Sequence, residues 1–400
     1  MGSAEAPSPE RAAGGTALAA PAATDTRLPR HAGGLGVGID RVAVDAFTIP
    51  TDLPESDGTY AWTSTTIVVV RAFGGGRTGH GYTYAHPAAG ALIVERLIPL
   101  VVGRDAADTS AAWSAMVAAV RNLGRPGIAA TAISAVDQAV WDLKARLLGL
   151  PLADLLGRAH ERVAGYGSGG FTSYTDAELR TQLGGWADAG FRAVKLKVGR
   201  EPEADPHRVA VARDAAGPDV AVMVDANGAL DRRSALGAAE AFAEQRVTWF
   251  EEPVSSDDIE GLRWLRDRTP ARMAVAAGEY AWGPDAFRRL LAAGAVDVLQ
   301  ADATRCTGVT GFLLASALCE SFHVPLSAHC APSIHLPLMA AARPALNMEW
   351  FHDHVRIEHL LFDGAPTPTN GWLVPDAAAP GFGLELREAD ATAYRVWSWA

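Results

Sequence analysis

Charged side chains end a series of short apolar runs in the middle of the chain. One run ends with Lys195 and Lys197, and later runs end at Asp225, Glu251 and Glu279. The intervals between these residues are typical of the strand–helix units of a (β/α)8 barrel. Because every strand of such a barrel points its carboxyl end at the same face, we expect these side chains to converge there.

Three converging carboxylates predict a divalent cation between them. Like charges at such close range do not all stay ionised without one. The oxygen ligands of Asp225, Glu251 and Glu279 suit Mg²⁺, or Mn²⁺, rather than zinc or copper. We expect the cation to lower the pKa of Lys197 and so help keep it a neutral base. A base facing a cation-held carboxylate can remove the proton from the adjacent carbon, because the metal neutralises the enediolate that forms.

Several short motifs follow one another at the predicted strand ends. They are K-x-K at 195–197, V-D-A-N at 224–227, E-E-P at 251–253, G-E at 278–279, and then Asp302 and His329. This ordered set resembles the enolase superfamily, mandelate racemase subgroup, and the resemblance runs from about Gly38 to the C-terminus. A Lys or His base combined with Mg²⁺ is established chemistry of that superfamily rather than a deduction from these residues.

The resemblance implies an α/β fold, a modified TIM (β/α)7β barrel with an N-terminal α+β capping domain. Residues 1–36, rich in Ala, Pro, Gly and Ser, are expected to form a disordered leader. We expect the capping domain at 37–150, the barrel at 151–365, and a segment at 366–400 that returns to the cap. Within the cap we predict strands at 38–50, 63–71 and 79–84, a polar loop at 51–62, and helices near 88–100, 107–120 and 128–148.

Loops of the capping domain contact substrate in the family that this chain resembles. By that resemblance Asp57, Trp62, Tyr84 and His86 are candidates for substrate specificity, and ordinary loop surface is the alternative. Asp137 and Asp142, on the helix predicted at 128–148, are expected to be structural.

Barrel residues receive roles by the same resemblance. Lys197 is the base, and Lys195 lies nearer the substrate carboxylate. Asn227 either stabilises the metal site or contacts substrate. Glu252 contacts the metal ligands without binding the metal itself. In the first barrel strand and just after it, Ser168 and Phe171 are candidates for lining the pocket.

A second acid/base pair is predicted at the later strand ends. An Asp302 carboxylate hydrogen-bonded to His329 would fix the tautomer of the imidazole and raise its basicity, on the side of the metal opposite Lys197. Glu349 matches the carboxylic acid that hydrogen-bonds the substrate carboxylate, which it can donate to only if protonated. Arg305, with Thr304, is a candidate for binding substrate oxygens. Arg305 and Asp302 stand where amino-acid epimerases of the family carry a lysine.

Three residues after the predicted eighth strand, His352, Asp353 and His354, are interpreted as pocket rim or core contacts rather than metal ligands. The three cysteines of the chain, Cys306, Cys319 and Cys330, have no metal-ligand spacing and are interpreted as reduced thiols of a cytoplasmic protein.

Composition restricts the partners. The formal net charge of −11 argues against nucleic-acid binding. No run of 18 apolar residues occurs, so no membrane span is predicted. The expected partner is a small-molecule carboxylate, and the resemblance implies a homo-oligomer, from dimer to octamer.

Two reaction outcomes are open after proton abstraction. Dehydration of an acid sugar to a 2-keto-3-deoxy acid is favoured, because many relatives with a Lys and an Asp–His pair dehydrate such acids. Racemisation, epimerisation or lactone cycloisomerisation through the same enediolate is the alternative. A sugar-acid binding protein without catalysis is the more remote one.

Overall fold

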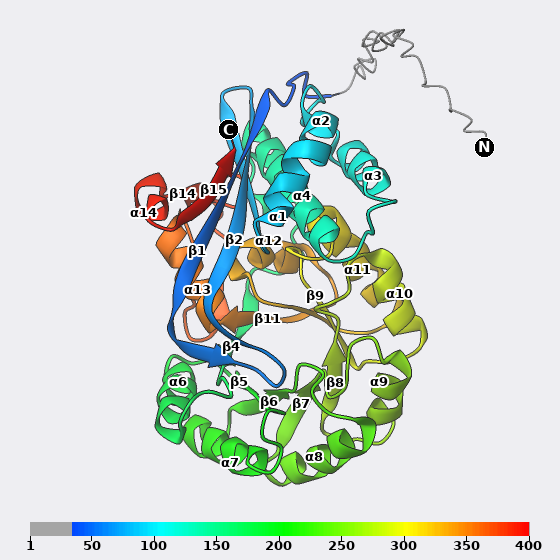
Figure 1. Ribbon diagram of the computed structural model, residues 1–400, viewed down its shortest axis with the longest axis vertical. Helices are drawn as coiled ribbons and strands as arrows, with labels where there is room; N and C mark the ends of the chain where they lie inside the picture. The colour runs from blue at the N-terminus through cyan, green and yellow to red at the C-terminus, as the bar shows by residue number, and fades with distance from the viewer. Residues whose placement is uncertain (1–33, 400) are drawn as a thin grey trace, which may run out of the picture.

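The computed structural model describes residues 34–399. These residues form a four-stranded antiparallel sheet with helices against it and a closed parallel barrel ringed by helices (Figure 1). The leader predicted at 1–36 lies almost entirely outside the described residues, so it stays a prediction, as do the predicted domain boundaries.

The antiparallel sheet has the strand order β15-β1-β2-β3. Its strands are β1 (Arg41–Ser56), β2 (Ala61–Gly74), β3 (Arg77–Tyr84) and β15 (Arg395–Trp399). Alternate apolar residues of β1 and β2 form a core with the helix α4 (Ile128–Leu148), which packs across β3 and β2. The last strand of the chain therefore completes the sheet that the first strand begins.

The predicted loop at 51–62 is wrong, because most of it is strand. β1 continues to Ser56, and β2 resumes at Ala61 after a tight turn. Oδ1 of Asp57 accepts hydrogen bonds from the amides of Thr59 and Tyr60, at 2.6 and 2.7 Å. A shift of register between Pro50 and Glu55 accommodates the prolines, which have no amide hydrogen to donate.

The helices of the cap begin after β3. The segment predicted as one helix near 88–100 is divided into α1 (Ala88–Leu92), a π-helical turn η1 (Ile93–Leu97) and α2 (Ile98–Val101). Pro99, near the start of α2, cannot donate an intrahelical hydrogen bond, which is consistent with the break. α3 (Thr109–Ala119) follows, and α4 spans the residues predicted for it.

Eight parallel strands form the barrel, which closes through pairing of β11 with β4. They are β4 (Val163–Gly169), β5 (Ala193–Lys197), β6 (Ala221–Asp225), β7 (Val247–Glu251), β8 (Ala274–Ala277), β9 (Val298–Ala301), β10 (Leu326–Ala328) and β11 (Ala345–Phe351). The predicted α/β barrel with an N-terminal cap is confirmed.

Helices precede, separate and follow the barrel strands and form an outer ring (Figure 1). They are α5 (Leu152–Leu156), α6 (Asp176–Asp188), α7 (Asp205–Ala216), α8 (Arg232–Glu244), α9 (Ile259–Arg266), α10 (Pro284–Ala292), α11 (Gly308–Phe322), α12 (Pro332–Ala341) and α13 (His352–Leu361). In the tail, β12 (Phe362–Asp363) pairs with β14 (Glu385–Leu386), β13 (Trp372–Leu373) pairs with β4, and α14 (Glu388–Thr392) precedes β15. Among the described residues no helix combines the length and the apolar character that a membrane crossing requires.

Helix α4 connects the cap to the barrel. Asp137 accepts hydrogen bonds from the amide and the hydroxyl of Thr310 in the first turn of α11, at 2.9 and 2.8 Å. Nε2 of Gln138 donates to the carbonyl of Ala303, at 2.8 Å, in the loop after β9. Asp142 accepts from the amide of His80 at 2.7 Å, so both aspartates have structural roles. The cap thereby holds the barrel loop that follows Asp302.

Candidate active site

Three acidic side chains meet at the carboxyl ends of β6, β7 and β8. They are Asp225, Glu251 and Glu279, and together they are called the carboxylate group below. One oxygen of each lies within 4.8 Å of the others, and all three side chains are buried. Asp225 and Glu251 are paired in register on adjacent strands. Gly278 has a φ of +139°, and a Cβ there would lie 2.1 Å from the carbonyl oxygen of Gln300. Only glycine therefore fits where the chain turns to present Glu279.

The electrostatics of these carboxylates fit a divalent cation. Burial and the neighbouring Asp225 raise the pKa of Glu251 to about 8, although Lys195 opposes the shift. Oε2 of Glu279 is buried and lies 3.0 Å from Nε2 of His329. Carboxylate oxygens that lie this close together are the ligands that Mg²⁺ and Mn²⁺ prefer.

Lys195 and Lys197 project from β5 into the same buried space. Nζ of Lys195 lies 2.7 Å from both carboxylate oxygens of Glu251 and 2.8 Å from Oε1 of Glu349. Nζ of Lys197 lies 2.5 Å from Oδ2 of Asp225. Burial, the largest single effect, lowers the pKa of Lys197, but Asp225 together with Glu279 and Glu251 raises it, so the net pKa lies above the ordinary value. A cation on Asp225 would oppose this effect, and the lowered pKa expected for Lys197 stays a prediction.

His329 and Asp302 form a buried pair at the ends of β10 and β9. Nδ1 of His329 lies 2.8 Å from Oδ2 of Asp302, and Nε2 lies 3.0 Å from Oε2 of Glu279. Oδ1 of Asp302 accepts from the amide and the hydroxyl of Thr304, both at 2.7 Å. Burial alone would raise the pKa of Asp302, but His329 holds it below its usual value. Lys197 and His329 therefore contact different members of the carboxylate group.

Glu349, at the end of β11, accepts several hydrogen bonds. Its donors are the Ser168 hydroxyl at 2.5 Å, the Cys330 amide at 2.9 Å and Lys195. Burial would raise its pKa, but Lys195 and His329 lower it below the ordinary value. The expected proton-donating Glu349 is at odds with these surroundings, because each of these contacts favours the ionised carboxylate.

Arg305 is engaged by the acidic side chains of the site. Its Nη1 lies 3.2 Å from Oε1 of Glu279, and its Nε lies 3.6 Å from Oδ2 of Asp302. The guanidinium also lies over the ring of Tyr280, 5.0 Å from the centroid. The predicted contact of Arg305 with substrate oxygens stays a prediction.

Asn227 and Glu252 border a cleft beside the carboxylate group. Both have left-handed backbones, with φ of +45° and +36°. Oδ1 of Asn227 and Oε1 of Glu252 are buried and have no hydrogen-bond partner. The cleft has a volume of about 1040 Å³ and is also lined by Trp113 of the cap and by Tyr280 after β8. The cleft lies between cap and barrel and is large enough for a small organic acid.

The candidates from the cap lie in different places. Trp62 packs edge-on against Phe171, with ring centroids 5.6 Å apart, and Phe171 packs against Phe351. Nζ of Lys197 lies 5.9 Å from the centroid of Phe351, so this aromatic group adjoins the base. Trp62 and Phe171 are thus placed beside the site.

Tyr84 and His86 have other neighbours. The ring of Tyr84 stacks on His354, with centroids 3.4 Å apart. His86 is exposed, and its Nδ1 accepts from the amide of Ala88 at the start of α1. The carboxylate of Asp57 accepts hydrogen bonds within its own turn, as described above. Among the described residues no hydrogen bond or ion pair joins Tyr84 or His86 to the carboxylate group.

His352 and Asp353, at the start of α13, connect that helix to the hairpin formed by β1 and β2. Nε2 of His352 lies 2.9 Å from Oδ2 of Asp52, and Asp353 bonds Thr65 and Arg356.

Two residues that lie beside the site were not predicted to do so from the sequence, Trp249 and Cys330. Nε1 of Trp249 donates to Oε2 of Glu251 at 3.0 Å. The period of two in a strand could have revealed it, because Trp249 and Glu251 share a face. Sγ of Cys330 lies 3.3 Å from Nε2 of His329. The Cys330 side chain points toward His329 because of the backbone conformation after β10. Cys330 has a φ of +53° there, which no sequence pattern indicated.

Comparison with known proteins places this site in a family. Residues 44–157 match the mandelate racemase / muconate lactonizing enzyme N-terminal domain, and residues 178–390 match the enolase C-terminal domain-like family. The chain is 31% identical over 373 residues to a D-gluconate dehydratase of Thermoproteus tenax, covering 87% of this chain and 73% of that one.

Solved structures are also similar. A mandelate racemase/muconate lactonizing enzyme-like protein from Rubrobacter xylanophilus is 53% identical with a TM-score of 0.88, covering 90% of this chain and 100% of that one. A racemase from Streptomyces coelicolor with bound magnesium is 30% identical with a TM-score of 0.84, covering 90% and 100%. The chain belongs to the mandelate racemase/muconate lactonizing enzyme family of the enolase superfamily. It is accordingly a Mg²⁺-dependent enzyme.

Proposed function

We propose that this enzyme dehydrates an acid sugar to a 2-keto-3-deoxy acid. One observation carries the proposal: Lys197 and His329 contact two different members of the carboxylate group, at Asp225 and Glu279. A substrate held at Asp225, Glu251 and Glu279 through the cation would then have a proton acceptor on one flank and a proton donor on the other. The similarity to a D-gluconate dehydratase supports this choice of reaction.

The chain's own residues account for each proton. Neutral Lys197 takes the proton from the carbon next to the substrate carboxylate. Protonated His329 gives the Nε2 proton to the β-hydroxyl, which leaves as water, and the enol that remains tautomerises to the keto acid. Lys195 attracts the substrate carboxylate, and Asp302 holds the imidazole of His329 in orientation. When bound, Mg²⁺ neutralises the negative charge that develops on that carboxylate.

Racemisation or epimerisation is the second candidate reaction, and cycloisomerisation of a lactone would use the same proton abstraction. The same pair, Lys197 and His329, would remove a proton from one face and return one to the other. The similarity to a racemase with bound magnesium favours keeping this alternative. A binding protein without catalysis is disfavoured, because both bases and the three carboxylates are present together.

One incubation separates these reactions. The protein is mixed with Mg²⁺ and a panel of mono- and diacid sugars in D₂O. A 2-keto acid formed with loss of the β-hydroxyl supports dehydration. Deuterium at the α-carbon with every hydroxyl retained supports racemisation or epimerisation. Neither product across the panel would contradict both enzymatic proposals and support binding alone.

Two wider properties also belong to the proposal. We expect a homo-oligomer, from dimer to octamer, as the family resemblance implies. A cytoplasmic location is supported by Cys306, Cys319 and Cys330, which are all buried free thiols.

A further inference from the structure

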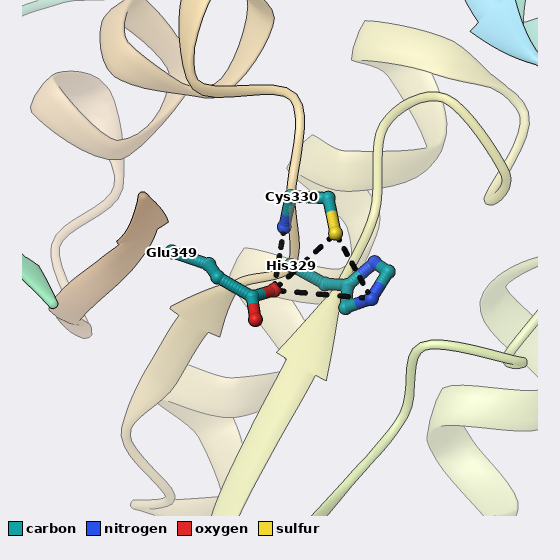
Figure 2. A group of neighbouring side chains, drawn as sticks. All are labelled: His329, Cys330 and Glu349. Atoms are coloured by element: carbon teal, nitrogen blue, oxygen red, sulfur yellow. Dashed lines mark hydrogen bonds and ion pairs between the residues drawn. The ribbon is translucent and has the colours of Figure 1, made fainter. Parts of the chain in front are cut away.

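His329, Cys330 and Glu349 bring three different kinds of metal ligand together beside the carboxylate group. Figure 2 shows the imidazole, the thiol and the carboxylate turned toward one another. Sγ of Cys330 lies 3.3 Å from Nε2 of His329 and 3.4 Å from Oε2 of Glu349, and Nε2 and Oε2 are 3.8 Å apart. All three side chains are at least nine-tenths buried.

These separations match a tetrahedral zinc site. Zinc bonds of about 2.3 Å to sulfur and about 2.0–2.2 Å to nitrogen and oxygen place neighbouring ligand atoms roughly 3.3–3.6 Å apart. The three ligand atoms therefore lie within a few tenths of an ångström of the required positions without rearrangement of the backbone. Three protein ligands leave a fourth position for water or substrate, as in catalytic zinc sites.

The surroundings orient the three ligands. Asp302 bonds Nδ1 of His329, so the lone pair of the neutral imidazole lies on Nε2, the nitrogen that faces Cys330. The amide of Cys330 donates to Oε2 of Glu349 at 2.9 Å, and its left-handed backbone directs the thiol at both partners. A non-glycine residue rarely adopts this conformation, and such strain is often found at functional sites.

We propose that His329, Cys330 and Glu349 form a binding site for a thiophilic divalent cation such as Zn²⁺. This site adjoins the Mg²⁺ site, because Nε2 of His329 lies 3.0 Å from Oε2 of Glu279, but its three ligands are different ones. The thiolate selects zinc over magnesium, which prefers oxygen ligands alone. Cys330 releases its thiol proton to solvent as the metal binds, and protonated His329 releases its Nε2 proton as well. Zinc here occupies Nε2 of His329 and one oxygen of Glu349, and so blocks the proton transfer that His329 carries out. The site thus makes the enzyme sensitive to inhibition by zinc while Mg²⁺ remains bound.

Cobalt provides a readout that does not depend on turnover. The protein is first saturated with Mg²⁺, and Co²⁺ is then added up to one equivalent per chain. We expect a thiolate-to-cobalt charge-transfer band and the visible spectrum of tetrahedral cobalt. Cys330→Ser should lose the charge-transfer band, whereas the matched control Cys319→Ser, a buried thiol within α11, should keep it.

Zinc inhibition is the second arm. With excess Mg²⁺, Zn²⁺ should inhibit the wild type and Cys319→Ser alike, and Cys330→Ser should require at least about tenfold more zinc, compared with its own zinc-free activity. Zinc-edge absorption spectroscopy of the wild type should show one sulfur at about 2.3 Å, which decides the question even if Cys330→Ser fails to fold. A zinc environment of oxygen and nitrogen alone, or equal inhibition of all three proteins, would overturn the proposal. Failure of the dehydration proposal would leave the cobalt and zinc spectra unchanged.

Discussion

Asp302 and His329 follow neighbouring barrel strands, and their side chains meet with Oδ2 and Nδ1 2.8 Å apart. The contact is buried, and the second oxygen of Asp302 is held by Thr304. Because Nδ1 is committed to Asp302, the other ring nitrogen of His329 is the one that faces Glu279 and the site. This relationship makes His329 an oriented acid/base rather than a passive core histidine.

Asp302→Asn should reduce kcat by roughly 10²–10⁴-fold, because the amide no longer enforces the tautomer or stabilises the protonated imidazole. The check is steady-state kinetics together with Mg²⁺ affinity, which should change little. Thr304→Val is the control, since it removes a bond to Asp302 but leaves the contact with His329, and it should cost about tenfold or less. Equal losses in the two variants would show that Asp302 acts only through general packing.

Mg²⁺ should stabilise the fold through Asp225, Glu251 and Glu279. At about 100 times its Kd, a ligand that binds only the folded state adds about 2.7 kcal/mol to the free energy of unfolding. Thermal unfolding with and without Mg²⁺ measures this increment. Asp225→Asn should lose most of it, whereas Asp376→Asn, an exposed site in the C-terminal tail, should keep it. An unchanged increment in Asp225→Asn would place the cation elsewhere.

Gly278→Ala tests the turn that presents Glu279. The new Cβ would meet the carbonyl of Gln300 at a backbone φ unsuited to alanine, so unfolding free energy should fall by about 2–4 kcal/mol. Mg²⁺ affinity should fall as well, because Glu279 is displaced. Gly237→Ala within α8, where a Cβ meets no atom within 4 Å, should instead stabilise by about 0.5–1 kcal/mol. Chemical denaturation of both variants provides the comparison.

The strand ends that carry Asp225, Glu251 and His329 could be predicted because a parallel barrel repeats one geometry. Each strand is a short apolar run, and the residue that ends it must lie at the same face as the others. The sequence therefore indicated which residues meet, without any knowledge of their separations.

Features that depend on side-chain direction or on distant partners could not be predicted in this way. Arg305 follows β9 in the sequence but forms an ion pair with Glu279, which follows β8. This pairing depends on how the charges are distributed in the folded protein. Glu349 accepts a hydrogen bond from the hydroxyl of Ser168. Ser168 lies on β4, which is far from β11 in the sequence and becomes its neighbour when the barrel closes. The strands of the first hairpin extend through polar residues and prolines, because pairing with a partner outweighs the local tendency to form a loop.

The most direct test of the account is α-proton exchange by Lys197→Ala and His329→Asn on a pair of substrates that are epimers at the α-carbon. The reaction is run with Mg²⁺ in D₂O, and deuterium at that carbon is followed by NMR. The account predicts that Lys197→Ala loses exchange with the epimer that the wild type dehydrates, because Lys197 is the base. His329→Asn should keep exchange with that epimer but form no 2-keto acid, because the acid that releases the β-hydroxyl is gone. Exchange of that epimer at the wild-type rate in Lys197→Ala, or keto-acid formation at the wild-type rate in His329→Asn, would contradict it.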